Sequence, residues 1–399
     1  MPHISERAIE MPQSPIRKLA PLAVAAKERG VHVYHLNIGQ PDLPTPEAGL
    51  NALRNIDRTV LEYSPSQGFR SYREKLTRYY EKYDIRLSPD DIIITAGGSE
   101  AVLFAFLSCL NPGDEIIVPE PAYANYMAFA ISAGARIRTI ATTIEEGFSL
   151  PKVEKFEELI NERTRAILIC NPNNPTGYLY TRREMNQIRD LVRKYDLYLF
   201  SDEVYREFIY TGSPYISACH LEGVEDNVVL IDSVSKRYSE CGIRIGALIT
   251  KNKAVRDAVM KFCQARLSPP LIGQLVAEAS LDEPDTYSRE VYDEYVERRK
   301  CLIDGLNRIP GCYSPIPMGA FYTVAKLPVD DAEKFCAWCL TDFQWEGRTV
   351  MMAPAAGFYT TPGAGRDQVR IAYVLKKEDL NDALSVLRKA LEAYPGRTL

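Results

Sequence analysis

One lysine carries the strongest chemical signal in the chain. Lys236 follows the apolar run 227–231 and stands among small hydroxyl residues, with Ser233 and Ser235 just before it. Arg244 comes eight positions later, between two glycines. A lysine amine at the end of a strand can form a Schiff base with an aldehyde, and a neighbouring arginine can bind a phosphate group. The pattern therefore predicts chemistry based on pyridoxal phosphate (PLP), an aldehyde cofactor that carries a phosphate.

The turn Gly97-Gly-Ser-Glu100 is a candidate phosphate site. It lies between the strand-like segment 92–95 and the apolar helical segment 101–107. Backbone N–H groups and the helix dipole both favour an anion at such a turn. A plain strand-to-helix turn is the alternative when the motif stands alone. With Ser233, Ser235 and Arg244 available to complete the site, Gly98 and Ser99 are predicted to bind the phosphate.

Asp202 ends the apolar segment 197–201, and Tyr205 follows three residues later. A carboxylate buried at a strand end is costly unless it is paired with a cation. A protonated pyridine nitrogen is a suitable partner, because the ion pair keeps the ring cationic. Tyr205 could donate a hydrogen bond to the phenolic oxygen of the same ring. The alternative for Asp202 is a helix N-cap, a position that aspartate fills readily.

Two further residues suit the recognition of an amino acid. Asn174 lies in the Pro- and Asn-rich segment 171–177, for which a turn is the simplest interpretation. A side-chain amide that points into a pocket can donate and accept at once, so Asn174 could contact both the ring oxygen and a carboxylate. Arg370 is the sole charge in the apolar segment 369–373. It could form an ordinary salt bridge, but a fork for an α-carboxylate, with bonds of about 1.5–3 kcal/mol each, is the favoured role.

Two tyrosines complete the candidate set. Tyr123 could stack on the face of the pyridine ring, and Tyr63 could reach a phosphate. Because the chain has 24 tyrosines, neither would be noticed without the other residues.

The elements that would position these side chains are short apolar runs that alternate with helical periods. Fully apolar strands separated by helices are typical of a mostly parallel sheet that is covered on both faces, which is an α/β fold. Ligands bind such sheets outside the carboxyl ends of the strands, and the motifs fall just after strands. The predicted strands are residues 91–95, 115–118, 166–169, 197–200, 228–231 and 246–250.

A chain of 399 residues is expected to form more than one domain. The residue pattern changes at about residue 285, where a long charged helical segment (286–306) precedes strand-like segments and a final amphipathic helix. We predict an N-terminal segment (1–44), a large cofactor-binding domain (45–284) and a small α+β domain (285–399). Five prolines before Leu43 favour an extended arm that lies against the small domain.

Composition excludes several other classes of function. The formal net charge of -5 gives no excess of basic residues, so nucleic acid is not an expected partner. No apolar run is long enough to span a membrane and no signal peptide is recognisable, so a cytoplasmic protein is expected. The CxxC pair Cys336 and Cys339 has no second pair nearby, and the four histidines do not cluster. A metal site is therefore not expected.

Five separated motifs, in this order and spacing, resemble the class I aminotransferases, which are fold-type I PLP enzymes. The resemblance covers nearly the whole chain and implies the aspartate aminotransferase-like fold, with a mostly parallel sheet in the large domain and a smaller α+β domain. The motifs are Asn37-Ile-Gly-Gln-Pro-Asp42, residues 63–74 from Tyr63, Asn174-Pro-Thr-Gly177, Ser235-Lys236 and Arg370.

The resemblance also implies roles for the candidate residues. Lys236 would hold the cofactor covalently, Asp202 would pair with the pyridine nitrogen, and Tyr205 and Asn174 would contact the ring oxygen. Phosphate would be bound by Arg244, Ser233, Gly98 and Ser99, and Tyr123 would stack on the ring. Arg370, Asn174 and the backbone of Gly39 would receive the α-carboxylate. The tyrosine that matches Tyr63 reaches the neighbouring subunit's cofactor in this family, which implies a homodimer.

The resemblance implies ping-pong transfer of an amino group between an L-amino acid and a 2-oxo acid, with aspartate and 2-oxoglutarate as the first choice. A side-chain carboxylate, however, needs a second cation. The lysine that follows the two glycines in some aspartate-type members is Ser99 here, and the arginine of other members has no match near residues 268–270. Arg266 is the leading candidate, with Arg17 and Arg237 as alternatives.

Alternative activities remain open on the same scaffold. They are a broad-range, alanine or aromatic aminotransferase, a β-lyase, and a cyclopropane-forming synthase. A DNA-binding regulator that retains this fold is a further alternative. It would need a helix-turn-helix domain ahead of the fold, and the fold signature already begins at Asn37.

Overall fold

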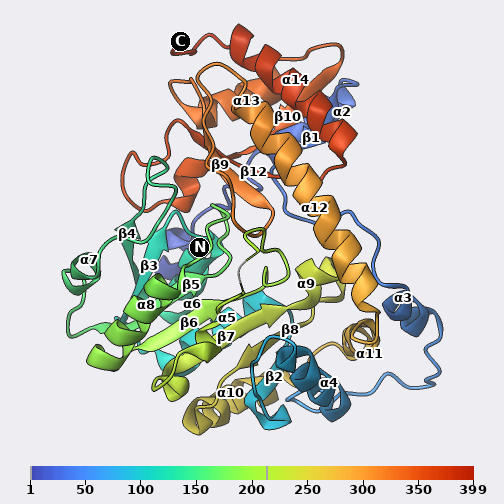
Figure 1. Ribbon diagram of the computed structural model, residues 1–399, viewed down its shortest axis with the longest axis vertical. Coiled ribbons are helices and arrows are strands. Elements are labelled where there is room, and N and C mark those ends of the chain that lie inside the picture. The colour runs from blue at the N-terminus through green and yellow to red at the C-terminus, as the bar shows by residue number, and fades with distance from the viewer. Residues whose placement is uncertain (1, 213) are drawn as a thin grey trace.

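The computed structural model describes residues 2–212 and 214–399, and its largest element is a seven-stranded sheet (Figure 1). The strand order is β2-β8-β7-β6-β5-β3-β4. All strands run parallel except β8, which is antiparallel to both of its neighbours. The predicted α/β fold with a mostly parallel sheet is confirmed. The strands are β2 (Ile92–Thr95), β3 (Glu115–Glu120), β4 (Arg136–Ala141), β5 (Thr164–Cys170), β6 (Tyr198–Asp202), β7 (Val228–Ser233) and β8 (Gly246–Ile249).

Helices cover both faces of this sheet, as the fully apolar strands predict. Successive side chains of a strand point to opposite faces, so neighbours in one strand enter different cores. Leu168 packs in the core that includes α5 (Gly98–Cys109) and α10 (Lys253–Arg266). Ile167 and Ile169 pack in a second core against α8 (Arg182–Tyr195). The remaining helices of this part are α3 (Glu47–Arg54), α4 (Arg70–Glu81), α6 (Asn125–Ala133), α7 (Val153–Glu157), α9 (Val234–Arg237) and α11 (Leu271–Ser280).

The edge strand β4 was not among the predicted strands. Its sequence, Arg136-Ile-Arg-Thr-Ile-Ala141, carries two arginines, and most of its residues are exposed or only half-buried. Charged side chains are a common way to protect the edge of a sheet from further pairing. A search for apolar runs therefore passes over it.

Two small sheets lie above the central sheet in Figure 1. One is the antiparallel set β11-β12-β9, and the other is the parallel pair β1-β10. Helix α12 (Asp285–Leu306) runs along one side, from the level of α11 up to α14. The other elements are β1 (His32–His35), β9 (Tyr322–Lys326), β10 (Arg348–Met351), β11 (Ala353–Pro354), β12 (Gln368–Ala372), α1 (Glu6–Glu10), α2 (Ala20–Glu28), α13 (Ala332–Thr341) and α14 (Lys377–Ala393). The proposed domain boundaries at residues 44 and 284 remain a prediction.

The N-terminal segment departs from the expected extended arm. Residues 20–28 form α2, whose Ala23 and Ala26 are buried, and β1 pairs with β10. Pro21 lies in the first turn of α2, where its missing N–H has no partner to lose. The number of prolines was therefore a misleading signal, because the position of each proline decides whether a helix can form.

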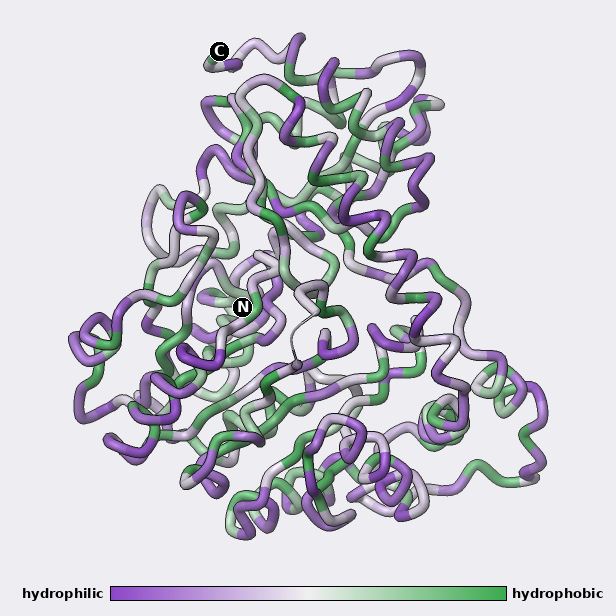
Figure 2. The backbone as a smooth tube through the Cα atoms, viewed as in Figure 1, coloured by the Kyte–Doolittle hydropathy of each residue, from purple (hydrophilic) through white to green (hydrophobic). Residues whose placement is uncertain are grey.

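Hydropathy follows this arrangement. In Figure 2 the hydrophobic stretches follow the interior strands, and hydrophilic stretches gather on the outer helices and loops. No helix within residues 2–212 and 214–399 is both long and apolar enough to cross a membrane.

Candidate functional site

A cavity of about 630 Å³ opens at the carboxyl ends of the central parallel strands. Every residue predicted to bind the cofactor or the α-carboxylate lines this cavity, except Tyr63. Most of the lining residues come from the segments after β2, β3, β5, β6 and β7, from the segment after β1, and from β9 and β12 of the small sheet. The structure therefore brings together side chains that are separated by more than 300 residues in the sequence.

The antiparallel direction of β8 explains how Arg244 reaches the cavity. Gly246, the first residue of β8, pairs with Thr95 at the end of β2 and with Ser233 at the end of β7. A strand that runs against its neighbours begins at the edge where they end. Arg244, which directly precedes β8, is consequently placed beside the carboxyl ends of the parallel strands.

Glycines allow this part of the cavity to close tightly. A Cβ atom on Gly246 would lie 2.5 Å from the carbonyl carbon of Gly97 and 2.6 Å from the nitrogen of Gly98. A Cβ atom on Gly97, whose φ is +80°, would lie 2.2 Å from a guanidinium nitrogen of Arg244. The guanidinium thus packs directly on the turn that begins α5. The N-terminal amides of α5 and the arginine together form a cationic cradle suited to a phosphate.

Lys236 lies on a short turn that a serine caps. The Ser233 hydroxyl donates to Ile245 O (2.9 Å) and accepts from the amide of Ser235 (3.1 Å), at the start of the four-residue helix α9 (Val234–Arg237). The amine of Lys236 donates to the carbonyl oxygen of Gly39 at 2.8 Å. The amine therefore reaches across the cavity to the segment that follows β1.

Asp202 is a buried carboxylate with neutral partners. Its Oδ2 accepts a hydrogen bond from Tyr126 at 2.6 Å, and its Oδ1 accepts a weaker one from the amide of Val204 at 3.4 Å. No arginine, lysine or histidine of the described residues pairs with it within 4.0 Å, the limit for an ion pair. Burial raises the pKa of Asp202 to about 6. A carboxylate in this position is suited to a cationic ligand atom.

Tyr205 belongs to a row of polar groups on the opposite wall. Its hydroxyl donates to the hydroxyl of Tyr322 at 3.1 Å and accepts from the amide of Asn174 at 3.4 Å. The hydroxyl of Tyr322 in turn donates to Gly39 O at 3.4 Å. Burial raises the pKa of Tyr205 well above its ordinary value, so the phenol stays protonated and can donate.

Arg370 is a buried cation that no carboxylate of the described residues neutralises. It is 1% exposed, and it donates to Asn174 Oδ1 at 3.2 Å and to the carbonyl oxygen of Asn37. Its Nε has no partner, and its guanidinium lies over the rings of Tyr322 and Phe358. Burial lowers the pKa of Arg370. Such a group is suited to an incoming carboxylate, which would supply the missing charge.

The two remaining tyrosines differ in position. Tyr123 lines the cavity and is held by a hydrogen bond from Asn125 Nδ2 to its hydroxyl at 2.8 Å. Tyr63 is 77% exposed and does not line the cavity of its own chain. An exposed tyrosine of this kind is free to contact another molecule.

Three contributors were missed from the sequence. Tyr322, Tyr126 and the backbone of Asn37 contact Tyr205, Asp202 and Arg370, respectively. Asn37 lies within a motif that was recognised, so its position gave a signal. Tyr322 and Tyr126 are two of 24 tyrosines and become visible only through their contacts.

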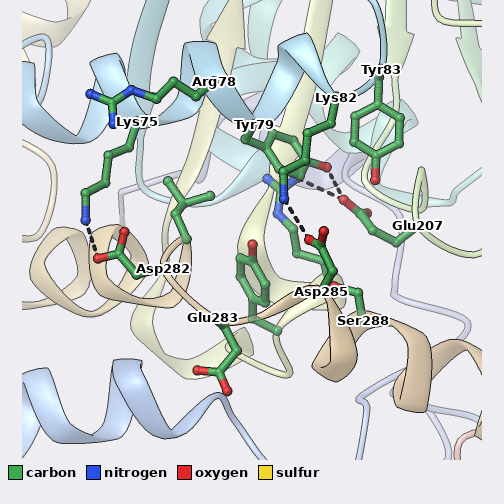
Figure 3. A pocket seen from close by; sticks show the side chains of 13 residues that line it. Lys75, Arg78, Tyr79, Lys82, Tyr83, Glu207, Asp282, Glu283, Asp285 and Ser288 are labelled. Carbon is green, nitrogen blue, oxygen red and sulfur yellow. Dashed lines mark hydrogen bonds and ion pairs between the residues drawn. The ribbon is translucent and has the colours of Figure 1, made fainter.

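A second hollow, of about 310 Å³, lies between α4 and the start of α12 (Figure 3). Ion pairs form its walls: Lys82 with Asp285 at 2.7 Å, Lys75 with Asp282, and Arg237 with Glu207 at 3.3 Å. Its charges largely neutralise one another. The hollow therefore gives no indication of a ligand, but its Arg237 belongs to a buried network that supports the cavity.

The buried network is centred on Asp232, the residue before Ser233. Asp232 accepts from Arg237 at 2.7 Å and from the amide of Ser233 at 2.8 Å, and it lies 3.6 Å from Arg206. Burial alone would raise the pKa of Asp232, but Arg237 and Arg206 outweigh that effect and hold the pKa below its usual value. Because the pKa of Asp232 is lower in the folded than in the unfolded protein, its charge stabilises the fold at every pH above the unfolded pKa. This stabilisation is lost as the pH falls through the folded pKa.

Replacing Asp232 by asparagine is expected to lower the free energy of unfolding by about 3–5 kcal/mol at pH 7, because two buried guanidinium groups lose their shared counter-charge. The loss should shrink as the pH falls below about 4, the pKa of the unfolded aspartate, and should vanish once the folded wild-type carboxylate is also protonated at its lower pKa. Denaturant unfolding at matched cofactor and protein concentration measures it. Asp226→Asn, an exposed carboxylate near the other end of β7, is the control. A loss below about 1 kcal/mol would show that the network contributes little.

Other kinds of site find no support in the described residues. No group of three or more His, Cys, Asp or Glu side chains among residues 2–212 and 214–399 could hold a metal ion. Cys336 and Cys339 are both buried in α13 as free thiols.

Known proteins share this arrangement. The family model for aminotransferase class I and II matches residues 31–387. An aspartate aminotransferase of Pyrococcus horikoshii is 32% identical over 395 residues, which is 98% of this chain and 97% of that protein.

Solved structures agree with the sequence comparison. An aspartate aminotransferase of Thermotoga maritima superposes with a TM-score of 0.89 at 30% identity, over 98% of this chain and 100% of the other. An alanine aminotransferase of Pyrococcus furiosus gives a TM-score of 0.88 at 29% identity, with the same coverage. The family match contains every residue that lines the cavity except three of the N-terminal segment: Ser14, Ile16 and Arg17.

Proposed function

This chain belongs to the aminotransferase class I and II family, and from that membership we propose that it uses pyridoxal 5'-phosphate to move an amino group from aspartate to 2-oxoglutarate. The similarity to aspartate aminotransferases over the full length supports the choice of donor. A comparable similarity to an alanine aminotransferase keeps a broader donor range as the alternative.

One observation carries the proposal: two unmatched buried charges face the same cavity as the lysine. Asp202 is a buried carboxylate without a cation, and Arg370 is a buried cation without a carboxylate. A pyridinium nitrogen would complete the first, and the α-carboxylate of an amino acid would complete the second. The residues therefore fit a phosphorylated pyridine aldehyde together with an amino acid.

Each part of the cavity would hold a defined part of the cofactor. Arg244, Ser233, Gly98 and Ser99 would bind the phosphate, and Asp202 would hold the ring nitrogen. Tyr205 and Asn174 would contact the ring oxygen, Tyr123 would stack on the ring face, and Lys236 would bond to the aldehyde. When bound, the cofactor supplies an electron sink that makes the substrate Cα–H acidic.

The protein's own groups then do the positioning and the proton transfer. Arg370 and Asn174 fix the α-carboxylate of the substrate, and so set the orientation of its Cα–H bond. Lys236 Nζ, which lies 2.8 Å from Gly39 O, is placed to take the Cα proton as a general base. Because one amino acid leaves as an oxo acid before the second substrate enters, ping-pong kinetics are expected.

We also propose a homodimer in the cytoplasm. Tyr63, exposed on its own chain, would reach the phosphate in the partner's cavity. All nine cysteines are free thiols, which is typical of proteins in a reducing compartment.

The proposal is tested by mixing cofactor-loaded protein with each of twenty amino acids in a stopped-flow spectrometer. Aspartate should convert the bound cofactor to its amine form in a single turnover and release one equivalent of oxo acid. Further turnover should require 2-oxoglutarate. Continuous release of pyruvate and ammonia without an acceptor would contradict the proposal and indicate a β-lyase instead.

A further inference from the structure

The cavity contains one cation more than the proposed reaction needs for its cofactor and α-carboxylate. Its charged lining residues are Asp202 and four cations: Arg17, Lys236, Arg244 and Arg370. Under the proposed function, on which this inference rests, three of the cations have a role. We propose that the fourth, Arg17, binds the side-chain carboxylate of a dicarboxylic amino acid or oxo acid, and so makes these the preferred substrates.

The guanidinium of Arg17 is free to bind a ligand. Arg17 is exposed toward the cavity, and no ion pair or side-chain hydrogen bond engages it within the described part of the chain. Burial raises the pKa of Tyr123 to about 12, and Arg370 and Arg17 both act against that rise. The charge of Arg17 therefore acts within the cavity, on the tyrosine proposed to cover the cofactor ring.

The backbone that carries Arg17 is held in place on both sides. Pro15 is buried and packs so closely on Gly357 that a Cβ atom there would lie 2.5 Å from its ring. On the other side, Lys18 forms an ion pair with Glu333 at 2.7 Å. Because the backbone is already fixed, binding a ligand costs only the ordering of the Arg17 side chain.

The same segment is tied to the proposed α-carboxylate site. Asn37 donates from its side-chain amide to Ile16 O at 2.9 Å, and its own carbonyl accepts from Arg370. One residue therefore links the backbone next to Arg17 with the guanidinium of Arg370. This link fixes the N-terminal segment relative to the group that would bind the α-carboxylate, as a site for both ends of a dicarboxylate requires.

The other candidates for the second cation are already engaged elsewhere. Arg266, the leading candidate from the sequence, lies 3.7 Å from Glu100, donates to backbone carbonyls and does not line the cavity. Arg237 is buried in the network with Asp232 and Glu207. Arg17 lies outside residues 31–387, the part of the chain that the family model matches.

The test compares Arg17→Gln, Arg370→Leu and wild type, all loaded with cofactor, on aspartate, glutamate, alanine and phenylalanine. Arg17→Gln is expected to lower kcat/KM about 10- to 100-fold for the two dicarboxylates, the loss of one charge-assisted contact. The change for alanine and phenylalanine should stay below about threefold. Arg17→Lys should retain most of the dicarboxylate activity, because the charge remains.

Arg7→Gln is the matched control, because it removes the same charge from the N-terminal segment at a residue that does not line the cavity. It should leave all four substrates unchanged. Arg370→Leu should weaken all four alike. A uniform loss for Arg17→Gln, or no loss for aspartate, would overturn the assignment of Arg17 while the aminotransferase activity stood.

Binding of substrate analogues gives an independent measurement. Calorimetry on the cofactor-loaded protein should show that Arg17→Gln weakens succinate about tenfold or more and leaves butyrate unchanged. The affinity for succinate should also fall with added salt more steeply in wild type than in the variant. If wild type reacts with no amino acid, the proposed function fails, and the succinate comparison still decides whether Arg17 binds a second carboxylate. Equal succinate affinity in wild type and Arg17→Gln would reject it.

Discussion

Lys236→Ala is expected to slow amino-group transfer by about 10⁴-fold or more, because the variant lacks both the proposed covalent bond to the cofactor and the base that takes the Cα proton. The variant should nevertheless bind the cofactor. Arg244, Ser233 and the amides of α5 would still hold the phosphate, and Asp202 would still hold the ring. Single-turnover kinetics and equilibrium dialysis measure the two properties separately.

The control for Lys236→Ala is Lys261→Ala, an exposed lysine on α10 outside the cavity. Borohydride reduction of the wild-type protein should attach the cofactor to Lys236 alone, and peptide mass mapping identifies the lysine. Attachment to another lysine would refute the assigned role. Complete loss of cofactor binding in Lys236→Ala would show that the phosphate cradle contributes less than its geometry indicates.

The parts of the site that the sequence predicts are those that follow strands directly. Asp202, Ser233 and Asn174 each come just after an apolar run, and parallel strands end at one edge of the sheet, so chain order alone brings them together. Arg244 reaches the same edge because it precedes β8, the strand of the central sheet that runs antiparallel to its neighbours. For these residues, local pattern and the layout of the sheet are sufficient.

Contacts between distant segments were beyond such reasoning. Tyr322 meets Gly39 across 283 residues of sequence, and a Cβ atom on Gly39 would lie 1.7 Å from the tyrosine hydroxyl. That proximity depends on how the small sheet packs over the central one. Arg17 and Arg266 could be ranked only by burial and partners, neither of which is visible in the sequence. The same holds for α2, where the number of prolines suggested an extended segment.

Asp202 is expected to stabilise the cofactor-loaded enzyme but to destabilise the cofactor-free protein. Burial raises its pKa to about 6, whereas the pKa of an unfolded aspartate is near 3.8. The folded state therefore binds the proton more tightly. The contribution of Asp202 to the free energy of unfolding is therefore most favourable below about pH 4. That contribution is lost as the pH rises through about 6. At neutral pH the charged carboxylate costs about 3 kcal/mol, an order-of-magnitude value from a shift of about two pH units.

Asp202→Asn is consequently expected to stabilise the cofactor-free protein above about pH 6, with a gain that vanishes by about pH 4. Asparagine can still accept the hydrogen bond from Tyr126. In the loaded enzyme the order should reverse, because only the carboxylate pairs with the pyridinium nitrogen, and the amino-transfer rate should fall about 10²–10³-fold. Thermal melting with and without cofactor, between pH 4 and 8, measures the reversal.

Glu240→Gln is the control that distinguishes pairing of Asp202 with the cofactor from the effect of burying a carboxylate. Glu240 is a buried carboxylate outside the cavity that accepts from Ser280 at 2.5 Å, and burial raises its pKa to about 7. Its replacement should also stabilise the cofactor-free protein at high pH, because burial raises the pKa of Glu240 as it raises that of Asp202. Cofactor should not change the order of wild type and Glu240→Gln, because Glu240 does not line the cavity. If Asp202→Asn shows no reversal either, then Asp202 is a buried structural acid, and a different group must hold the ring nitrogen.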